Sequence, residues 1–422
     1  MGNSREIAAE ALCRVENDGA YSNIIIGNLL VGNNLSKEDK ALATALFYGV
    51  LDRKLTLDFY IGKLSSVKVK KIEPMTRQAL RIGIYQLCYM KKIPVNAAVN
   101  ESVNIVKGTS EERNSGFINA ILRNAADKLP QLPTSNDLYS LSVRNSCPVW
   151  IIEELLRDYG VVQTEEIIKA YLLPAKLSVC VNTLKTTASE LYTKLSELGI
   201  DSMISPEGDS LDIFGGIDFK NNKLFNEGYF YVQDTVSKNC AKVLGAVPDE
   251  RILDVCAAPG GKSFTIAQSM KNTGEIVSCD LYKNRVSLIE DGAKRLGISN
   301  LKAIVNDATV YNETFGRFDA VICDVVCSGF GVIRRKPEIK YKKAESFEEL
   351  EKIQEDILNT SSKYVKNGGR LLYSTCTLRK NENEKQVEKF LSTHRDFVCK
   401  CMKTDLPCKE HDGFFYALLI RN

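Results

Sequence analysis

Apolar residues follow a helical spacing through the first part of this chain of 422 residues. Within residues 4–128 they recur three or four positions apart, as at Leu80, Ile84 and Leu87. Short polar turns separate the segments, and the pattern stops at a proline-containing stretch that begins at Pro130. This spacing predicts a set of packed α-helices, because side chains three and four positions apart share one face of a helix.

The apolar pattern becomes mixed after this linker. Residues 149–173 predict two more helices, and the segment that follows alternates short extended runs with one amphipathic helix. This organisation predicts a small α+β unit. Its expected strands cover residues 177–182, 202–204, 211–213 and 229–232, and its expected helix covers residues 188–198.

From about residue 238 the chain alternates buried β-type runs with amphipathic segments. Such alternation predicts a mainly parallel, doubly wound sheet, with helices expected between the first five strands. The last two strands have only a short connection, so we expect an antiparallel hairpin at one sheet edge. The predicted strands are residues 252–256, 275–280, 301–306, 318–324, 369–374, 397–402 and 414–420.

These patterns predict a multidomain protein with three parts. We expect an all-α domain at residues 1–135, linker helices and a small α+β domain at 136–237, and an α/β Rossmann-like domain at 238–422. No apolar run approaches the ~20 residues of a membrane span, and the N-terminus lacks a signal-peptide pattern. With thirteen cysteines in a long chain, we expect reduced thiols and a cytoplasmic protein.

A glycine-containing turn follows the first strand of the α/β domain. Its sequence after Asp254 lacks the G-x-G-x-x-G of dinucleotide sites, and Cys256 stands where a phosphate-binding G-x-x-x-x-G-K-[ST] motif needs glycine. The turn nevertheless lies at the carboxyl end of a strand, where open α/β sheets bind ligands. Taken alone, it could be only a structural turn. Its candidate binding residues are Cys256, Ala257, Ala258, Pro259, Gly260, Gly261 and Lys262.

Acidic residues end the next three strands. Asp280 can accept hydrogen bonds from both ribose hydroxyls of a nucleoside, Asp307 can reach an adenine edge, and Asp324 ends the fourth strand. A single strand-end Asp is often only a helix cap. Three in consecutive units beside a glycine turn favour a nucleoside cofactor, which we infer to be S-adenosylmethionine.

Two cysteines lie where the fourth and fifth strands end, Cys327 and Cys376. A thiolate that adds to carbon 6 of a pyrimidine makes carbon 5 nucleophilic enough to attack a sulfonium methyl, so a thiol pair beside this cofactor suits methylation at carbon 5. Cys399, Cys401, Cys408 and His411 form a poor zinc pattern, because C-x-C lacks the usual spacing, and we expect no metal.

Basic residues gather in two regions, although the net charge is only +3. Lys and Arg outnumber Asp and Glu in residues 51–130, and a second cluster directly follows the Cys327 motif. Charge runs are often only solvated surface. Beside a candidate catalytic loop, they favour binding to the phosphates of a nucleic acid. The second cluster contains Arg334, Arg335, Lys336, Lys340, Lys342 and Lys343, and its first three residues are the candidate RNA-binding residues.

The combined motifs resemble the bacterial ribosomal RNA small-subunit methyltransferase B (Sun) family of 5-methylcytosine RNA methyltransferases. The resemblance covers nearly the whole chain. Residues 5–128 resemble the NusB-like RNA-binding domain of that family, and 181–185 with 228–234 resemble its middle domain. The catalytic resemblance rests on residues 254–262, 324–335, 374–376, 381–384 and 412–417.

The resemblance implies a role for each motif residue. It implies that Cys376 attacks cytosine carbon 6, that Cys327 assists product release, and that Asp324 binds the cytosine edge and borders the cofactor. Residues 256–262 with Asp280 and Asp307 would bind S-adenosylmethionine as a class I methyltransferase does. The expected partner is 16S (small-subunit) ribosomal RNA, and we expect a monomer.

Several residues depart from the pattern of this family. Val325 and Val326 replace Ala-Pro, and the loss of proline would loosen the catalytic loop. Phe330 stands at a position commonly small, and Cys147 and Cys180 replace His and Arg. Two other functions therefore stay open, the same chemistry on transfer RNA and a catalytically silent RNA-binding assembly factor.

Overall fold

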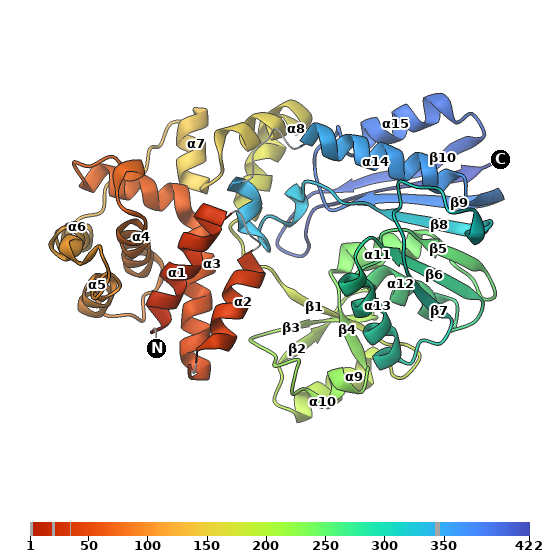
Figure 1. Cartoon of the computed structure of the whole chain (residues 1–422), viewed down its shortest axis with the longest axis horizontal. Helices are drawn as coiled ribbons and strands as arrows, with labels where there is room; N and C mark the ends of the chain where they lie inside the picture. Colours follow the sequence, from red (N-terminus) through yellow and green to blue (C-terminus); the bar gives the residue numbers. More distant parts are fainter. Residues whose placement is uncertain (1–2, 19–21, 34, 342–346) are drawn as a thin grey trace. The chain divides into compact units, whose positions relative to one another are not determined.

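The computed structural model describes residues 3–18, 22–33, 35–341 and 347–422. The chain divides into two compact units (Figure 1). The first contains the N-terminal residues up to Leu172 together with Ile333–Lys343, and the second contains Leu173–Val332 and Ala344–Asn422. This division into two units does not test the domain boundaries expected at residues 135 and 237, which therefore remain a prediction.

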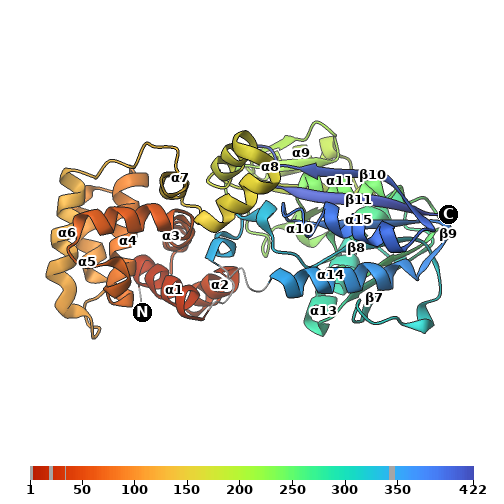
Figure 2. The ribbon, with the colours of Figure 1, turned by 90° about the horizontal axis from the view of Figure 1, so that it is seen from above.

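The first unit is helical, as the apolar spacing predicts (Figure 2). Leu46, Phe47, Leu80 and Leu122 are fully buried at the centre of one hydrophobic cluster. Local signals set the helix limits, because the Ser36 hydroxyl accepts a hydrogen bond from the Asp39 N–H at the start of α3. The helices are α1 Ser4–Asp18, α2 Ser22–Gly32, α3 Lys37–Leu64, α4 Pro74–Tyr89, α5 Val95–Asn104, α6 Ser115–Asp127, α7 Leu138–Asn145 and α8 Val149–Ala170, with 3-10 turns η1 Val69–Lys71 and η2 Glu112–Asn114.

Helix α8 consists of two helical stretches. Gly160 interrupts it with φ +73° and ψ −178°, a conformation that residues with a side chain rarely adopt. The two helices predicted over residues 149–173 are therefore confirmed as two parts of one kinked element.

A segment from the C-terminal half of the sequence completes the helical unit. The 3-10 helix η5 (Pro337–Tyr341) carries Lys340, which is 1% exposed. The Lys340 Nζ donates hydrogen bonds to the carbonyl oxygens of Asp52 (2.8 Å) and Ser146 (3.0 Å). The Tyr341 hydroxyl donates to the Leu51 carbonyl at 2.9 Å. These contacts hold Lys340 and Tyr341 within this unit, whereas Lys336 in the same segment is exposed.

The second unit contains two sheets. The smaller is antiparallel with strand order β2-β3-β1-β4, and all four predicted strands are present. A capping box between Thr187 and Glu190 starts its helix α9. The elements are β1 Leu177–Val181, α9 Ala188–Glu197, β2 Ser202–Ile204, β3 Ser210–Ile213, α10 Lys223–Asn226 and β4 Phe230–Val232.

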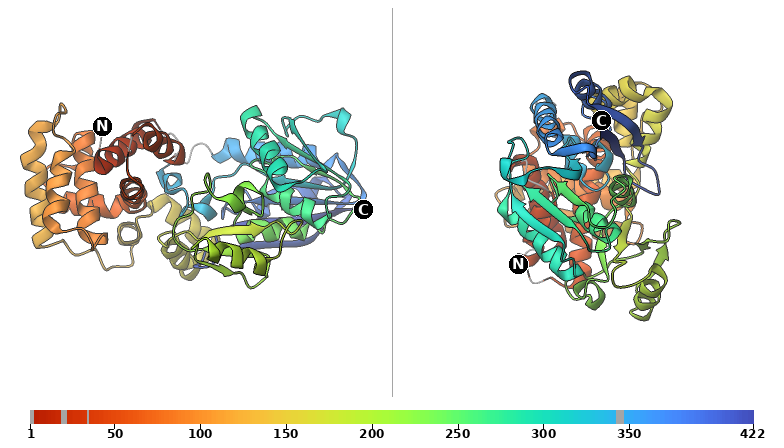
Figure 3. Two further views of the ribbon diagram at one scale, coloured as in Figure 1. Left: turned by 90° about the horizontal axis from the view of Figure 1, so that it is seen from below. Right: turned by 90° about the vertical axis from the view of Figure 1, so that its right-hand side faces the viewer.

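The larger sheet has seven strands in the order β10-β11-β9-β8-β5-β6-β7. Its green-to-blue ribbons lie within the second unit (Figure 3). The five strands from β9 to β7 are parallel, and β11 and β10 pair antiparallel at the β9 side. Both the parallel sheet and the edge hairpin are confirmed. The strands are β5 Arg251–Asp254, β6 Glu275–Asp280, β7 Leu301–Val305, β8 Phe318–Asp324, β9 Val365–Thr375, β10 Phe397–Asp405 and β11 Phe414–Arg421.

Helices cover both faces of the larger sheet. Side chains of α11 (Thr235–Val243), α12 (Gly261–Ser269) and α13 (Lys283–Leu296) share one apolar cluster with the strands. Those of α14 (Phe347–Ser362) and α15 (Glu384–Thr393) share another. The helix predicted between β7 and β8 is wrong, because that connection contains only a 3-10 turn, η3 (Glu313–Phe315), whose N-cap is the Asn312 side chain.

The parts together show the predicted fold class, a helical domain, a small α+β domain and a Rossmann-like domain. Among the helices that the structure describes, none has the length and apolar character needed to span a membrane.

Candidate active site

The turn between β5 and α12 requires its glycines. Gly260 has φ +112°, and a Cβ atom there would lie 2.3 Å from the Phe264 ring. A Cβ at Gly261 would lie 3.2 Å from the Gln233 side chain. The Gly260 N–H donates to the Ala257 carbonyl at 2.7 Å, which closes the turn. The backbone is thus held open at the N-terminus of α12, where helix N–H groups can face a ligand.

Asp254 lies beneath this turn and is fully buried. One carboxylate oxygen accepts a hydrogen bond from the Ser263 hydroxyl at 2.7 Å, and Ser263 accepts one from Ser278 at 2.8 Å. The other oxygen is buried and has no hydrogen-bond partner among the described residues. Burial raises the pKa of the Asp254 carboxyl to about 7.

The structure places Asp280 and Asp307 beyond the carboxyl ends of neighbouring strands. Asp280 ends β6, is 3% exposed, accepts a hydrogen bond from the Tyr282 N–H at 3.3 Å and pairs with Arg285 at 3.2 Å. Asp307 is exposed, and its Oδ1 accepts hydrogen bonds from the backbone and hydroxyl of Thr309. Both carboxylates therefore lie at the carboxyl-end edge of the sheet, the edge that also bears the glycine turn, as the sequence predicts.

Asp324 forms an ion pair with Lys262 at the end of β8. The Lys262 Nζ lies 2.7 Å from the Asp324 Oδ2 and 2.8 Å from the Ser237 hydroxyl. The Ser374 hydroxyl donates to the other Asp324 oxygen at 2.8 Å. Lys262 is 8% exposed. Burial lowers its pKa, but the Asp324 carboxylate together with Cys240 and Asp254 raises the pKa above its ordinary value. The Asp324 carboxylate is thus held at the end of β8 by Lys262 of α12 and Ser374 of β9.

The two cysteines predicted to be catalytic meet in the structure. Cys327 follows β8 and Cys376 follows β9, and these parallel neighbours bring the sulfur atoms within 3.2 Å. Contact with the Cys376 thiol, followed by burial, raises the pKa of Cys327 well above its ordinary value. Two adjacent thiols do not ionise independently, so Cys327 stays protonated when its neighbour carries the charge.

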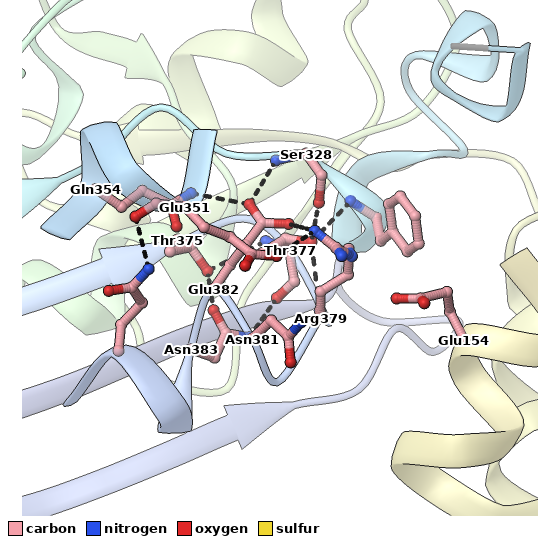
Figure 4. A network of polar contacts seen from close by, with 12 residues as sticks. Glu154, Ser328, Glu351, Gln354, Thr375, Thr377, Arg379, Asn381, Glu382 and Asn383 are labelled. Atoms are coloured by element: carbon pink, nitrogen blue, oxygen red, sulfur yellow. Dashed lines mark hydrogen bonds and ion pairs between the residues drawn. The ribbon is translucent and has the colours of Figure 1, made fainter. Parts of the chain in front are cut away.

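One group at this site was missed by the sequence analysis. Glu382 is completely buried and its carboxylate accepts hydrogen bonds from the loops that carry both cysteines (Figure 4). The sequence signal for Glu382 is the acidic motif at residues 381–384, which carries the family resemblance but does not by itself predict a contact with the cysteine loops.

The basic cluster after Cys327 divides by exposure. Arg334 is buried, Arg335 is half-buried and Lys336 is exposed, whereas Lys340 is buried within the helical unit. Lys342 and Lys343 lie outside the described residues. The cluster is therefore not one continuous solvated face.

The positions that depart from the family pattern are mostly interior. Val325 is buried while Val326 is 55% exposed, and the buried Phe330 ring packs edge-on against Phe347 at 5.9 Å. Cys147 and Cys180 are both buried.

All thirteen cysteines lie in the described part of the chain and remain thiols. The described residues contain no group of three or more His, Cys, Asp or Glu side chains arranged to hold a metal ion.

A five-stranded parallel core extended by an antiparallel hairpin, with a glycine turn after its first strand and acids after the next, defines the Rossmann-like methyltransferases that use S-adenosylmethionine. Residues 241–420 match the 16S rRNA methyltransferase RsmB/F family, residues 2–127 the NusB family, and residues 147–211 the ferredoxin-like domain of RsmF/B-like methyltransferases. The chain belongs to the RsmB/F family.

Full-length relatives support this membership. A probable ribosomal RNA small subunit methyltransferase B of Bacillus subtilis (strain 168) is 37% identical over 399 residues, covering 93% of this chain and 89% of that protein. A protein with the same name from Synechocystis sp. (strain PCC 6803) is 32% identical and covers 99% of both chains. The crystal structure of PH0851 superposes with a TM-score of 0.82 at 27% identity, covering 99% of both chains.

Proposed function

We propose that this protein methylates carbon 5 of a cytosine in 16S ribosomal RNA, using S-adenosylmethionine and a covalent bond to Cys376. The observation that carries the proposal is the pair of thiols 3.2 Å apart at the ends of adjacent strands. Family membership supports the reaction class, and the full-length relatives carry the name of a small-subunit ribosomal RNA methyltransferase.

The cofactor fits the edge of the sheet that bears the glycine turn. S-adenosylmethionine supplies a sulfonium methyl group when bound. The backbone of residues 256–262 lies at the N-terminus of α12, and the Asp280 carboxylate can accept hydrogen bonds from ribose hydroxyls. Asp307 would contact the adenine edge. A Cβ atom at Gly260 or Gly261 would meet the Phe264 or Gln233 side chain, so these glycines allow the turn to keep the course that leads into the N-terminus of α12.

Cys376 acts as the nucleophile. Its thiolate adds to carbon 6 of cytosine, the C5=C6 electron pair moves to carbon 5, and carbon 5 accepts the methyl group. Water then accepts the carbon-5 proton, the C5=C6 bond re-forms, and the bond between carbon 6 and the Cys376 sulfur breaks. The departing Cys376 sulfur takes the proton of the Cys327 thiol, which solvent replaces. Cys327 assists this release as a protonated thiol beside the adduct, consistent with its raised pKa. Asp324, oriented by Lys262 and Ser374, holds the cytosine edge near N3 and N4.

The covalent intermediate provides the test. Incubation with 16S ribosomal RNA and S-adenosylmethionine should give no covalent complex and no methylation with Cys376→Ala. Cys327→Ala should accumulate a protein–RNA band that survives a denaturing gel, because the adduct forms but resolves slowly. Cys401→Ser, an exposed cysteine on β10, serves as the matched control and should behave as wild type. A band that appears with Cys376→Ala and vanishes with Cys327→Ala would reverse the two roles.

Contacts with RNA phosphates would come from the basic residues after Cys327. Of the three residues predicted for this role, Arg335 and Lys336 keep solvent exposure, and Arg334 is buried. Replacing Arg335 and Lys336 with Ala should weaken RNA binding and reduce the slope of log K against log salt by about one per lost contact. Cofactor affinity should not change. An unchanged salt slope would show that the cluster is only surface charge.

Bisulfite sequencing of RNA from cells with and without the protein would identify the substrate. Loss of one 16S cytosine signal supports the proposal, whereas loss from transfer RNA, or no loss at all, favours the transfer RNA or the silent assembly-factor hypothesis. We further propose a monomer that works in the cytoplasm, where ribosomal RNA is made and thiols stay reduced.

A further inference from the structure

The carboxylate of Glu382 is the centre of a buried polar network (Figure 4). Its Oε2 accepts hydrogen bonds from the Ser328 N–H at 2.8 Å and from the Gln354 Nε2 at 2.9 Å. Its Oε1 accepts one from the Arg379 Nη1 at 3.0 Å, and the residue is 0% exposed. A buried carboxylate is tolerated when it is paired and hydrogen-bonded in this way, and it is costly to disturb.

The network joins the two cysteine loops to each other. Ser328 immediately follows Cys327, and Thr377 immediately follows Cys376. The hydroxyls of Ser328 and Thr377 share a hydrogen bond of 2.6 Å. The loop geometry around the thiols thus depends on groups that meet at Glu382 and not on the strands alone.

The two cysteines depend on Glu382 to different degrees. Cys376 directly follows Thr375, which ends β9 and pairs with Phe415 in the sheet, and the Cys376 carbonyl accepts a hydrogen bond from the Gly331 N–H at 2.9 Å. Cys327 lies in a connection without strand pairing, and its neighbour Ser328 is held through its N–H by Glu382. Loss of the carboxylate would therefore displace Cys327 more than Cys376.

We propose that Glu382 is a positioning residue that holds the Cys327 loop against Cys376, so that it governs release of the covalent intermediate more than its formation. This inference rests on the proposed function of the two thiols. Arg379 supports the same geometry, because it pairs with Glu382 and also with Glu351 at 3.1 Å. The negative charge of Glu382 also contributes to the raised pKa of Cys327.

Glu382→Gln is the direct test, because it keeps the side-chain size and removes the charge and one acceptor. Its matched control is Glu384→Gln, because the Glu384 carboxylate lies two residues later and accepts a hydrogen bond from the Thr404 hydroxyl on β10 at 2.8 Å. Both variants are assayed in the full chain with RNA and S-adenosylmethionine. We expect Glu382→Gln to lose about ten- to one-hundredfold in turnover while the covalent band accumulates as in Cys327→Ala. Glu384→Gln should match wild type, and calorimetry should show unchanged cofactor affinity for both.

A role in stability alone would give a different result. Adduct and product would then fall together in Glu382→Gln, and this outcome or wild-type turnover overturns the inference. Should Glu382→Gln not fold, Gln354→Leu removes only one donor to Glu382 and one to the Val326 carbonyl, and it should show the same band with a smaller loss of turnover. Failure of that variant to accumulate the band likewise overturns the inference. Absence of any band in Cys327→Ala would instead contradict the proposed thiol chemistry, so the two failures remain distinguishable.

Discussion

Asp254 should make the stability of the catalytic unit depend on pH. The carboxyl is fully buried, and burial raises its pKa from the ordinary value of 3.8 to about 7. As pH rises from about 4 to about 7, the unfolded chain loses this proton first while the folded chain keeps it. The stabilisation from the raised pKa is therefore full below pH 3.8 and is lost as pH rises through about 7.

The size of the effect follows from the shift. Each pKa unit corresponds to ~1.4 kcal/mol, so the two units between pH 5 and the folded pKa should cost wild type about 3 kcal/mol between pH 5 and pH 8. Asp254→Asn imitates the protonated carboxyl, because the amide oxygen can still accept from Ser263 and cannot ionise. The variant should lose this part of the pH dependence and should be more stable relative to wild type at pH 8 than at pH 5.

Hydrogen exchange measured by mass spectrometry at pH 5, 6, 7 and 8 provides the assay, after correction for intrinsic exchange rates. Peptides from β5 and α12 report the free energy of opening around Asp254, and peptides from α4 to α6 in the helical unit serve as an internal control. Identical pH profiles for wild type and Asp254→Asn in the β5 and α12 peptides would refute the reasoning.

Three further predictions concern the cofactor turn and the thiols. Asp280→Ala should weaken S-adenosylmethionine binding by roughly 1.5–3 kcal/mol in calorimetry, and unchanged affinity would remove Asp280 from the site. Dilute hydrogen peroxide should oxidise Cys327 and Cys376 to a disulfide with release of water, because their sulfur atoms already lie 3.2 Å apart. Peptide mapping should show the linked pair lost on reduction, and unlinked thiols would contradict this geometry. Gly260→Ala should cost ~1–3 kcal/mol in thermal unfolding because of its positive φ and the Phe264 ring, and an unchanged transition would show that the turn can relax.

Much of the catalytic unit follows from local sequence patterns. The strands were predictable because buried parallel strands are continuous apolar runs in the sequence. The acids Asp280, Asp307 and Asp324 were predictable as strand-end residues because each is a polar residue at the end of such a run. The connection between β7 and β8 was not predictable in the same way. The regular alternation suggested a helix, but Val310 and Tyr311 in this segment are exposed and Asn312 instead caps a 3-10 turn.

Long-range contacts account for the rest. Nothing near Glu382 in the sequence shows that it accepts the Ser328 N–H from a loop 54 residues away. The local sequence likewise does not reveal which residues of the basic cluster after Cys327 are buried. A run of basic residues in the sequence does not distinguish exposed side chains from buried ones. Only the fold shows that the Lys340 Nζ donates hydrogen bonds to the carbonyl oxygens of Asp52 and Ser146.

The placement of residues 333–341 also has a consequence for the order of events during protein synthesis. The N-terminal helices leave the ribosome well before the segment that carries Lys340 and Tyr341. Until that segment is made, the carbonyl oxygens of Leu51, Asp52 and Ser146 lack the donors they have in the finished protein. The nascent helical unit therefore reaches its final hydrogen bonding only after the Cys327 loop has been translated. A chain interrupted before residue 333 would lack Lys340 and Tyr341, and its helical unit would therefore lack these three hydrogen bonds.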